Sequence, residues 1–111
     1  MQVKDAVQKL GLEVQAGGEG LEQQITGGCT SDLLSYVMSA ARAGNIWITV
    51  QVHPNIIGVA ALLNLSAVVV TGEQPPEPAT LAKAQEQGVT VLSTTENSYT
   101  VAGRLYAMGV R

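Results

Sequence analysis

The chain has 111 residues, 46% of them hydrophobic, which suits one domain built around a single core. Only six Lys and Arg residues and a net charge of -3 argue against nucleic acid and anionic membranes as main partners. Aromatic residues make up 4% and Phe is absent, so the core is expected to be aliphatic and few rings remain to stack on bases.

The cysteine content and the amino terminus bear on the cellular compartment. The single cysteine, Cys29, excludes an internal disulfide and a cysteine-based metal site, and it suits a reducing environment. The first residues are charged and lack the apolar segment of a signal peptide. No apolar run approaches the roughly 18 residues of a membrane-spanning helix. We therefore expect a soluble, cytoplasmic protein.

The amino-terminal part predicts one helix followed by two short strands. Residues 3–10 repeat apolar side chains at helical spacing, and Gly11 suits the left-handed position after a helix. Residues 12–15 alternate like a strand with one wet face, and the glycine-rich residues 16–20 are typical of a turn. Residues 21–25 contain three consecutive polar side chains and predict a weak strand at a sheet edge.

A loop and a second helix are expected next. Residues 26–32 form the loop, in which Thr30 or Ser31 can cap the helix and Asp32 can complement its dipole. Gly44 is expected to end this helix. Its apolar face comprises Leu33, Leu34, Val37, Met38 and Ala41.

The segment from Asn45 to Gly72 has the pattern of a βαβ unit. Its outer runs, residues 46–50 and 67–70, are rich in β-branched side chains and nearly continuous, which is typical of parallel strands covered on both faces. Residues 56–63 between them predict a short helix. Parallel strands joined in this way end at the same edge of the sheet, where open α/β folds bind ligands.

The remaining residues predict two more helices and one strand. Prolines stiffen residues 73–78, a helix covers residues 78–87, a buried strand covers residues 89–92, and the last helix covers residues 98–108. The glycines that end the predicted helices are Gly11, Gly44, Gly88 and Gly109. This order of elements predicts a three-layer α/β/α domain with a mostly parallel sheet of about five strands.

Polar loops that follow the predicted strands are expected to meet at one edge of the sheet. Hydroxyl residues and glycines beside helix amino termini offer unpaired backbone N–H groups, which suit an anion or a small polar ligand. The alternative is that these residues serve only turn geometry and helix capping. The candidate ligand-binding residues are Thr26, Gly27, Gly28, Ser31, Asp32, His53, Asn55, Thr71, Gly72, Ser93 and Thr94.

His53, the only histidine, is the one candidate for a general base. Catalysis would require a partner carboxylate, and the acidic residues considered for that role are Asp32 and Glu73. A histidine at the end of a strand more often forms a hydrogen bond within its own loop. Either His53 or Asn55 can also cap the helix that follows.

Other chemical sites find little support in the sequence. Gly27-Gly28 precedes a helix, but it lacks the lysine and the spacing of a phosphate loop. Cys29 lies near a helix amino terminus without a convincing histidine partner and is interpreted as a small buried or half-buried residue. One histidine and scattered carboxylates show no metal-ligand spacing. Tyr99 and Tyr106 share one face of the last helix, which favours a core or subunit contact.

Several segments, in order, resemble the DRTGG domain family over nearly the whole chain from Leu12 onward. The family motif is retained only as Thr26-Gly27-Gly28, because Gln24 and Ile25 stand where the family has Asp and Arg. That acidic and basic pair is therefore absent from this chain. The resembling segments are residues 26–35, 47–55, 69–72, 92–94 and 98–102.

This resemblance implies a regulatory or assembly module rather than an enzyme. Similar domains accompany CBS nucleotide-sensing domains in regulated pyrophosphatases and occur in the non-catalytic part of some phosphotransacetylases. The resemblance implies one DRTGG-like domain over residues 1–111, with a fold similar to the amino-terminal domain of HPr kinase/phosphorylase. It further implies a homodimer, and no cofactor is expected.

Three functions compete at this point. The first is a self-associating regulatory module that senses a small polar or anionic ligand, such as a nucleotide, at the carboxyl edge of the sheet, or that contacts a partner protein. The second is a small-molecule enzyme that uses His53 and Asp32. The third is a structural domain that binds no ligand.

Overall fold

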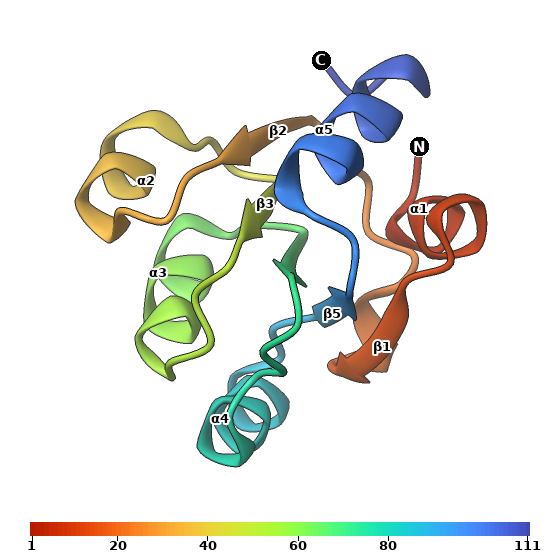
Figure 1. Ribbon diagram of the computed structural model, residues 1–111. Helices are drawn as coiled ribbons and strands as arrows, with labels where there is room; N and C mark the ends of the chain where they lie inside the picture. The colour runs from red at the N-terminus through yellow and green to blue at the C-terminus, as the bar shows by residue number, and fades with distance from the viewer.

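The computed structural model describes residues 1–111 as a five-stranded sheet between two layers of helices (Figure 1). The strand order is β1-β5-β4-β3-β2, and all neighbours are parallel except β1 and β5, which are antiparallel. The strands are β1 (Glu13–Ala16), β2 (Gly27–Thr30), β3 (Asn45–Thr49), β4 (Ala67–Thr71) and β5 (Val91–Thr94). The predicted α/β class and mostly parallel sheet are confirmed.

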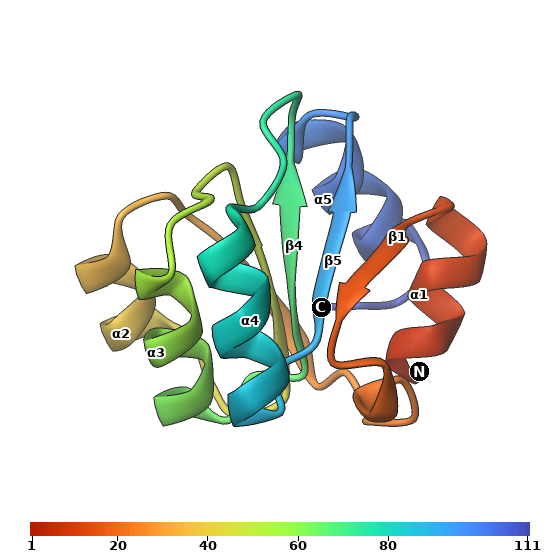
Figure 2. The ribbon, with the colours of Figure 1, turned by 90° about the horizontal axis from the view of Figure 1, so that it is seen from below.

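Helices cover both faces of the sheet, as the three-layer prediction requires. Helices α2, α3 and α4 lie on one face and α1 and α5 on the other (Figure 2), with a separate hydrophobic cluster under each layer. A short 3-10 helix, Gly18–Gly20, follows β1. None of the helices is long and apolar enough to cross a membrane. Their bounds are α1 (Val3–Leu10), α2 (Leu34–Ala40), α3 (Asn55–Leu63), α4 (Pro78–Gln87) and α5 (Ser98–Ala107).

The β3-α3-β4 unit forms the centre of the molecule and confirms the predicted βαβ unit. Every residue of β3 and β4 is buried, because both strands lie inside the sheet and are covered on both faces. Trp47 in β3 and Val68 in β4 face the α2-α3-α4 layer, whereas Ile48 and Val69 face α1 and α5. Apolar side chains on both sides of each strand are therefore needed, which explains the continuous β-branched runs.

The prediction of a strand over residues 21–25 is wrong. This segment forms only one isolated bridge, Gln2 to Gln24. Its carbonyl groups instead accept hydrogen bonds from the start of α1: Val3 N–H donates to Gln23 and Lys4 N–H to Leu21, at 2.9 and 2.8 Å. The first N–H groups of a helix have no partner inside the helix, so this segment satisfies them.

The edge strand lies later in the chain, at Gly27–Thr30, inside the region predicted to be a loop. Its glycines have low strand propensity, but backbone pairing with β3 in parallel register overrides that preference. Gly28 is paired with Ile46 and Thr30 with Ile48. An edge strand therefore exists in this part of the chain, but it covers Gly27–Thr30 rather than residues 21–25.

Helix α2 is shorter and more exposed than predicted. It ends at Ala40, and Gly44, predicted to end it, lies four residues later in the turn that enters β3. Of the predicted apolar face, Val37 and Ala41 are buried, but Leu33 is 64% and Met38 42% exposed. The reason is that α2 covers the edge of the sheet, where there is less surface to bury against than at α3.

Candidate functional site

The four parallel strands end at one edge of the sheet, as predicted. The arrowheads of β4 and β5 point to this edge in Figure 2, and the parallel register places the ends of β2 and β3 beside them. Each of the four strands ends in a threonine: Thr30, Thr49, Thr71 and Thr94. This carboxyl edge brings together the predicted candidates from Ser31 onward: Ser31, Asp32, His53, Asn55, Thr71, Gly72, Ser93 and Thr94.

Asp32 joins the exit of β2 to the exit of β3. Its Oδ1 accepts hydrogen bonds from the Thr49 hydroxyl at 2.9 Å and from Val50 N–H at 2.8 Å. Gln51 Nε2 donates to the Asp32 carbonyl at 3.0 Å. The predicted interaction of this carboxylate with the dipole of α2 is therefore replaced by bonds to the neighbouring strand exit. Ser31 Oγ instead accepts Leu33 N–H at 3.1 Å, at the start of the helix.

The hydroxyl groups at the other two exits also bond within the protein. The Thr71 hydroxyl donates to the Thr49 carbonyl at 3.4 Å and lies 2.7 Å from Ser98 Oγ. Ser93 Oγ accepts from Gln15 Nε2 at 2.8 Å. At the same edge, Gly72 N–H donates to the Glu96 carbonyl at 3.1 Å, and Thr94 Oγ1 accepts Glu96 N–H at 3.2 Å. These hydroxyl groups therefore already have partners within the protein and stabilise the loops.

His53 helps to begin α3 and does not contact a carboxylate. Its Nδ1 accepts the N–H of Asn55, the first residue of α3, at 3.1 Å. No hydrogen bond or ion pair joins His53 to Asp32 or to Glu73. Either His53 or Asn55 was expected to cap this helix. His53 is the residue whose side chain forms the hydrogen bond with the helix amino terminus.

Thr26, Gly27 and Gly28 lie at the opposite end of β2 from the carboxyl edge, so the expectation that they meet the other candidates at that edge is wrong. Gly27 is paired with Asn45 at the start of β3. The Thr26 hydroxyl donates to the Ala43 carbonyl at 2.8 Å and accepts from Asn45 Nδ2 at 3.2 Å. The error follows from the misplaced strand: these residues begin β2 rather than follow a strand.

The charge of the carboxyl edge is negative. The loops that leave β2 to β5 (residues 31–33, 50–54, 72–77 and 95–97) contain no Lys or Arg. The one cation paired with them is Arg104 of α5, whose Nη1 lies 3.2 Å from Glu96. Their acidic residues are Asp32, Glu73, Glu77 and Glu96. An anionic ligand would be repelled from most of this edge.

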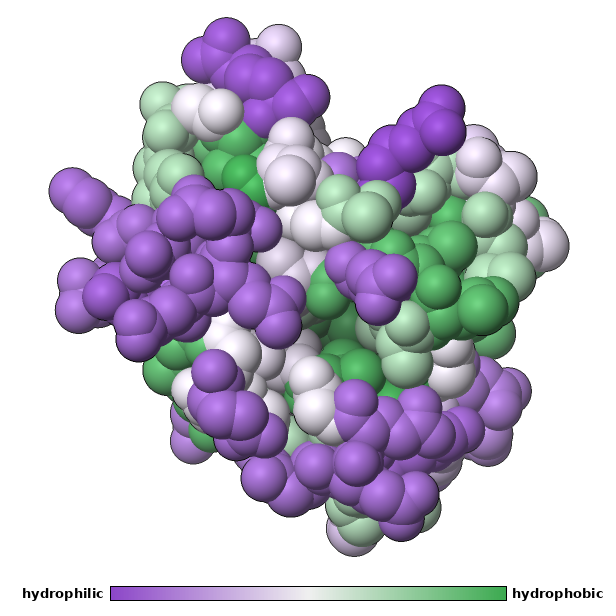
Figure 3. Space-filling view, turned by 180° about the vertical axis from the view of Figure 1, so that it is seen from behind, coloured by the Kyte–Doolittle hydropathy of each residue, from purple (hydrophilic) through white to green (hydrophobic).

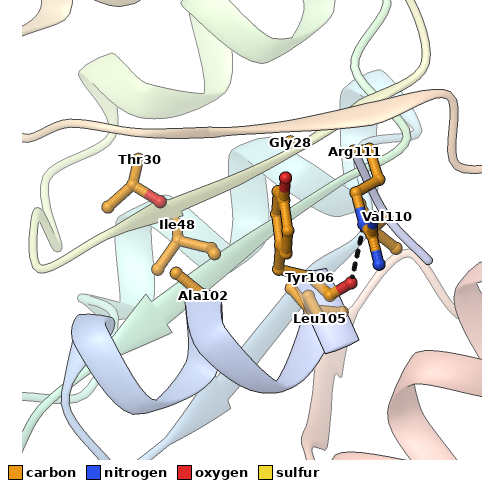
Figure 4. A pocket seen from close by; sticks show the side chains of 8 residues that line it. All are labelled: Gly28, Thr30, Ile48, Ala102, Leu105, Tyr106, Val110 and Arg111. Atoms are coloured by element: carbon orange, nitrogen blue, oxygen red, sulfur yellow. Dashed lines mark hydrogen bonds between the residues drawn. The ribbon is translucent and has the colours of Figure 1, made fainter. Parts of the chain in front are cut away.

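A groove that the sequence did not predict lies between β2, β3 and α5 (Figure 4). It has a volume of about 190 Å³ and is mainly apolar, with an arginine and a tyrosine at one end. The Arg111 guanidinium lies 4.3 Å from the centre of the Tyr106 ring, and its Nε donates to the Tyr106 carbonyl at 3.1 Å. The lining residues are Gly28, Thr30, Ile48, Ala102, Leu105, Tyr106, Val110 and Arg111.

Large apolar side chains are exposed on the two helices that flank β2. Tyr106 of α5 is 59% exposed and Tyr99 88%, so neither belongs to the core. On the other face, Leu33, Tyr36 and Met38 are exposed at α2. The rear view in Figure 3 shows hydrophobic residues on the α2 side of the molecule and an indentation between that side and α5. The unpaired edge of β2 lies between these two surfaces, because both α2 and α5 contact it.

Cys29 is the middle of β2 and is half-buried against the α2-α3-α4 cluster. Burial raises the pKa of its thiol above the usual value, so the thiolate is disfavoured at neutral pH. No group of three or more His, Cys, Asp or Glu side chains is placed to hold a metal ion.

The DRTGG domain family matches residues 7–108. A crystal structure of the CBS and DRTGG domains of the regulatory region of Clostridium perfringens pyrophosphatase, complexed with the activator diadenosine tetraphosphate, has a similar fold, with a TM-score of 0.71 and 19% sequence identity. The similarity covers 92% of this chain and 44% of that chain, so the present sequence spans less than half of that protein chain. No curated protein matches the sequence.

Proposed function

The chain belongs to the DRTGG domain family, and on this premise we propose that it is a non-catalytic regulatory and assembly module that self-associates. The observation that carries the proposal is the exposed apolar surface on both sides of β2, the edge strand whose outer side is unpaired. Contiguous exposed apolar surface on a soluble protein typically marks an interaction site. The free edge of a sheet adds unpaired backbone groups to the same place.

The arrangement at the carboxyl edge supports a non-catalytic role. The Asp32 carboxylate is bonded to Thr49 and Val50, and His53 is bonded to Asn55. A general base needs a group that holds its tautomer and a path to substrate, and these two side chains serve separate loops. The only support for the enzyme alternative is therefore that Asp32 and His53 lie at the same carboxyl edge of the sheet.

Similarity to a regulatory region gives further support. The related structure is described as the regulatory region of a pyrophosphatase with a bound activator. At 19% identity the likeness concerns the fold, so the regulatory role of this chain remains our proposal.

Self-association predicts a particle of twice the chain mass. Light scattering over a concentration series from about 1 μM to several hundred μM should show a monomer–dimer equilibrium with the dimer dominant at the upper end. Tyr106→Ser is expected to weaken the dimer, because it removes exposed apolar area from the flank of β2. Leu62→Ser on α3 is the matched control, because Leu62 is also a large, exposed apolar side chain (67%) but is not on a helix that flanks β2. A wild-type protein that stays monomeric throughout would contradict the proposal.

Ligand sensing is a second candidate function, and the groove beside α5 supports it better than the acidic carboxyl edge. The groove has the one arginine of this region, Arg111, next to an aromatic ring, which suits an anionic aromatic molecule. We predict that ATP or diadenosine tetraphosphate at about 100 times its dissociation constant stabilises the fold by about 2.7 kcal/mol.

Two variants locate that ligand. Arg111→Ala should abolish the thermal shift, whereas Asp32→Asn, which retains an acceptor at Oδ1, should leave it unchanged. The reverse result would place the ligand at the carboxyl edge, as the sequence alone suggested. No thermal shift with either nucleotide would favour a structural domain without a ligand.

A further inference from the structure

One edge of the sheet, strand β2, is unpaired and exposes its backbone. Ser31 N–H donates to the Ile48 carbonyl at 3.2 Å, on the side of β3. Backbone groups alternate in direction along a strand, so Cys29 also faces β3, whereas Gly28 and Thr30 direct their N–H and C=O groups away from the sheet. Both of these residues are exposed. Two donors and two acceptors are therefore available on this edge.

The two edges of the sheet differ in their protection. Strand β1, at the other edge, has an irregularity in its register between Val14 and Ala16 and carries the charged Glu13. Bulges and charges are the usual features that prevent edge-to-edge pairing. Strand β2 pairs regularly with β3 and contains only Gly, Cys and Thr. It has neither a bulge nor a charged side chain.

We propose that β2 pairs antiparallel with β2 of a second copy, about a two-fold axis that passes through the Cys29 pair. This inference rests on the proposed self-association and specifies its surface. In this register Gly28 of each copy is opposite Thr30 of the other, and the two residues exchange N–H···O=C bonds. All four outward groups of each strand are then used. The result is one continuous ten-stranded sheet with five strands from each copy.

A second copy fits this edge better than an unrelated chain. A strand without charged side chains meets its own copy without like-charge repulsion. The antiparallel arrangement also brings the carboxyl end of one β2, with Asp32, toward the amino end of the other. Arg111 lies at that amino end, with its backbone 3.8 Å from the position of a Cβ on Gly27. Residues of opposite charge, Asp32 of one copy and Arg111 of the other, therefore occupy the same end of the strand pair.

The same symmetry accounts for the exposed apolar side chains on the flanks. A two-fold axis perpendicular to the sheet keeps each helix layer on its own face, so α2 lies beside α2 and α5 beside α5 across the axis. Tyr36 and Met38 are about 200° apart around α2, so one of the two can face its counterpart on one face. On the other face, Tyr106 of α5 is exposed and lines the groove with Gly28 and Thr30 of β2, beside the strand pair. Residues that are exposed in one copy thus become buried in the pair.

Cys29 reports on the register directly. Opposite residues of a non-hydrogen-bonded antiparallel pair have Cα atoms about 4.5 Å apart and side chains on the same face. A disulfide requires a Cα separation of about 4.4–6.8 Å. The wild-type protein should therefore form a covalent dimer when treated with diamide, which takes up the two electrons and two protons released by the two thiols.

The cross-linking experiment is best done at alkaline pH, because burial raises the pKa of the Cys29 thiol. Under native conditions most of the dimer should become covalent, while protein unfolded in guanidinium at the same concentration should not. Cys29→Ser should remain a non-covalent dimer by light scattering. A native dimer in which Cys29 does not cross-link would overturn the proposed register.

A matched pair of variants at Thr30 tests the backbone pairing. Thr30→Pro removes the outward N–H, and proline is tolerated on an edge strand whose N–H faces solvent. It should weaken dimerisation about 30-fold, because two symmetry-related hydrogen bonds are lost. Thr30→Val keeps the N–H and the branched side chain, so its dissociation constant should stay within about twofold of wild type. Circular dichroism monitors folding, and the wild-type cross-link gives a result even where Thr30→Pro unfolds.

The outcomes of these experiments distinguish a failure of the proposed β2 interface from a failure of the proposed self-association. A dimer that fails to cross-link, and in which Thr30→Pro associates like wild type, contradicts pairing through β2 and leaves self-association intact. A protein that is monomeric at several hundred μM contradicts the proposed function itself.

Discussion

Gly17→Ala is expected to destabilise the fold by at least about 3 kcal/mol, since it combines backbone strain with a backbone overlap. Gly17 has φ +70°, a left-handed conformation that side chains with a Cβ rarely adopt. A Cβ at this position would overlap the Val89 carbonyl and lie 2.7 Å from Thr90 Cα. These atoms belong to the backbone that enters β5, so a flexible side chain cannot move aside to relieve the overlap.

Gly88→Ala is the matched control for this prediction. Gly88 has nearly the same backbone conformation, φ +69°, but a Cβ there meets nothing within 4 Å. Its expected cost is only about 1–2 kcal/mol, from the strain alone. Denaturant unfolding followed by the fluorescence of the single, buried Trp47 measures both. Equal losses in the two variants would show that the close approach at Gly17 adds nothing.

The centre of the fold was predictable because its signal is local. The runs before and after α3 are β-branched and continuous, and the structure has β3 and β4 there, fully buried. Helix α4 begins at Pro78 and ends before Gly88, where proline and glycine act through their own backbone preferences. In these segments, propensity, pattern and tertiary environment agree.

The edge strand was not predictable from local preference. Residues 27–30 contain two glycines and no apolar alternation, so their strand conformation depends on pairing with Asn45–Thr49. The same misplacement put Thr26 to Gly28 in the ligand site, although they lie at the other end of β2. The parallel strand exits were predicted correctly, and the residues from Ser31 onward lie at that edge.

Neither the groove nor the acidic character of the carboxyl edge was predicted from the sequence. The groove is formed by residues of β2, β3 and α5 that are far apart in sequence, such as Thr30, Ile48 and Tyr106. The acidic residues of the edge are distributed over separate loops, so they do not form a continuous acidic segment in the sequence. A search for charged side chains near all predicted strand exits would have found the acidic edge, whereas the groove depends on the correct position of β2.

The most direct consequence of pairing through β2 is protection of two backbone amides. Gly28 and Thr30 N–H groups have no partner in one copy, and each forms a hydrogen bond across the two-fold axis in the pair. Their hydrogen exchange should slow by about 100-fold or more when the protein passes from monomer to dimer. Ser31 N–H, which is bonded to Ile48 in either state, provides the internal reference.

Residue-resolved amide exchange above and below the dimer dissociation constant therefore tests the account as a whole. The expected result is concentration-dependent protection at Gly28 and Thr30, with Ser31 protected at both concentrations. A sample that scatters light as a dimer while Gly28 and Thr30 exchange at the rate of free amides would show that this strand is not where the copies meet.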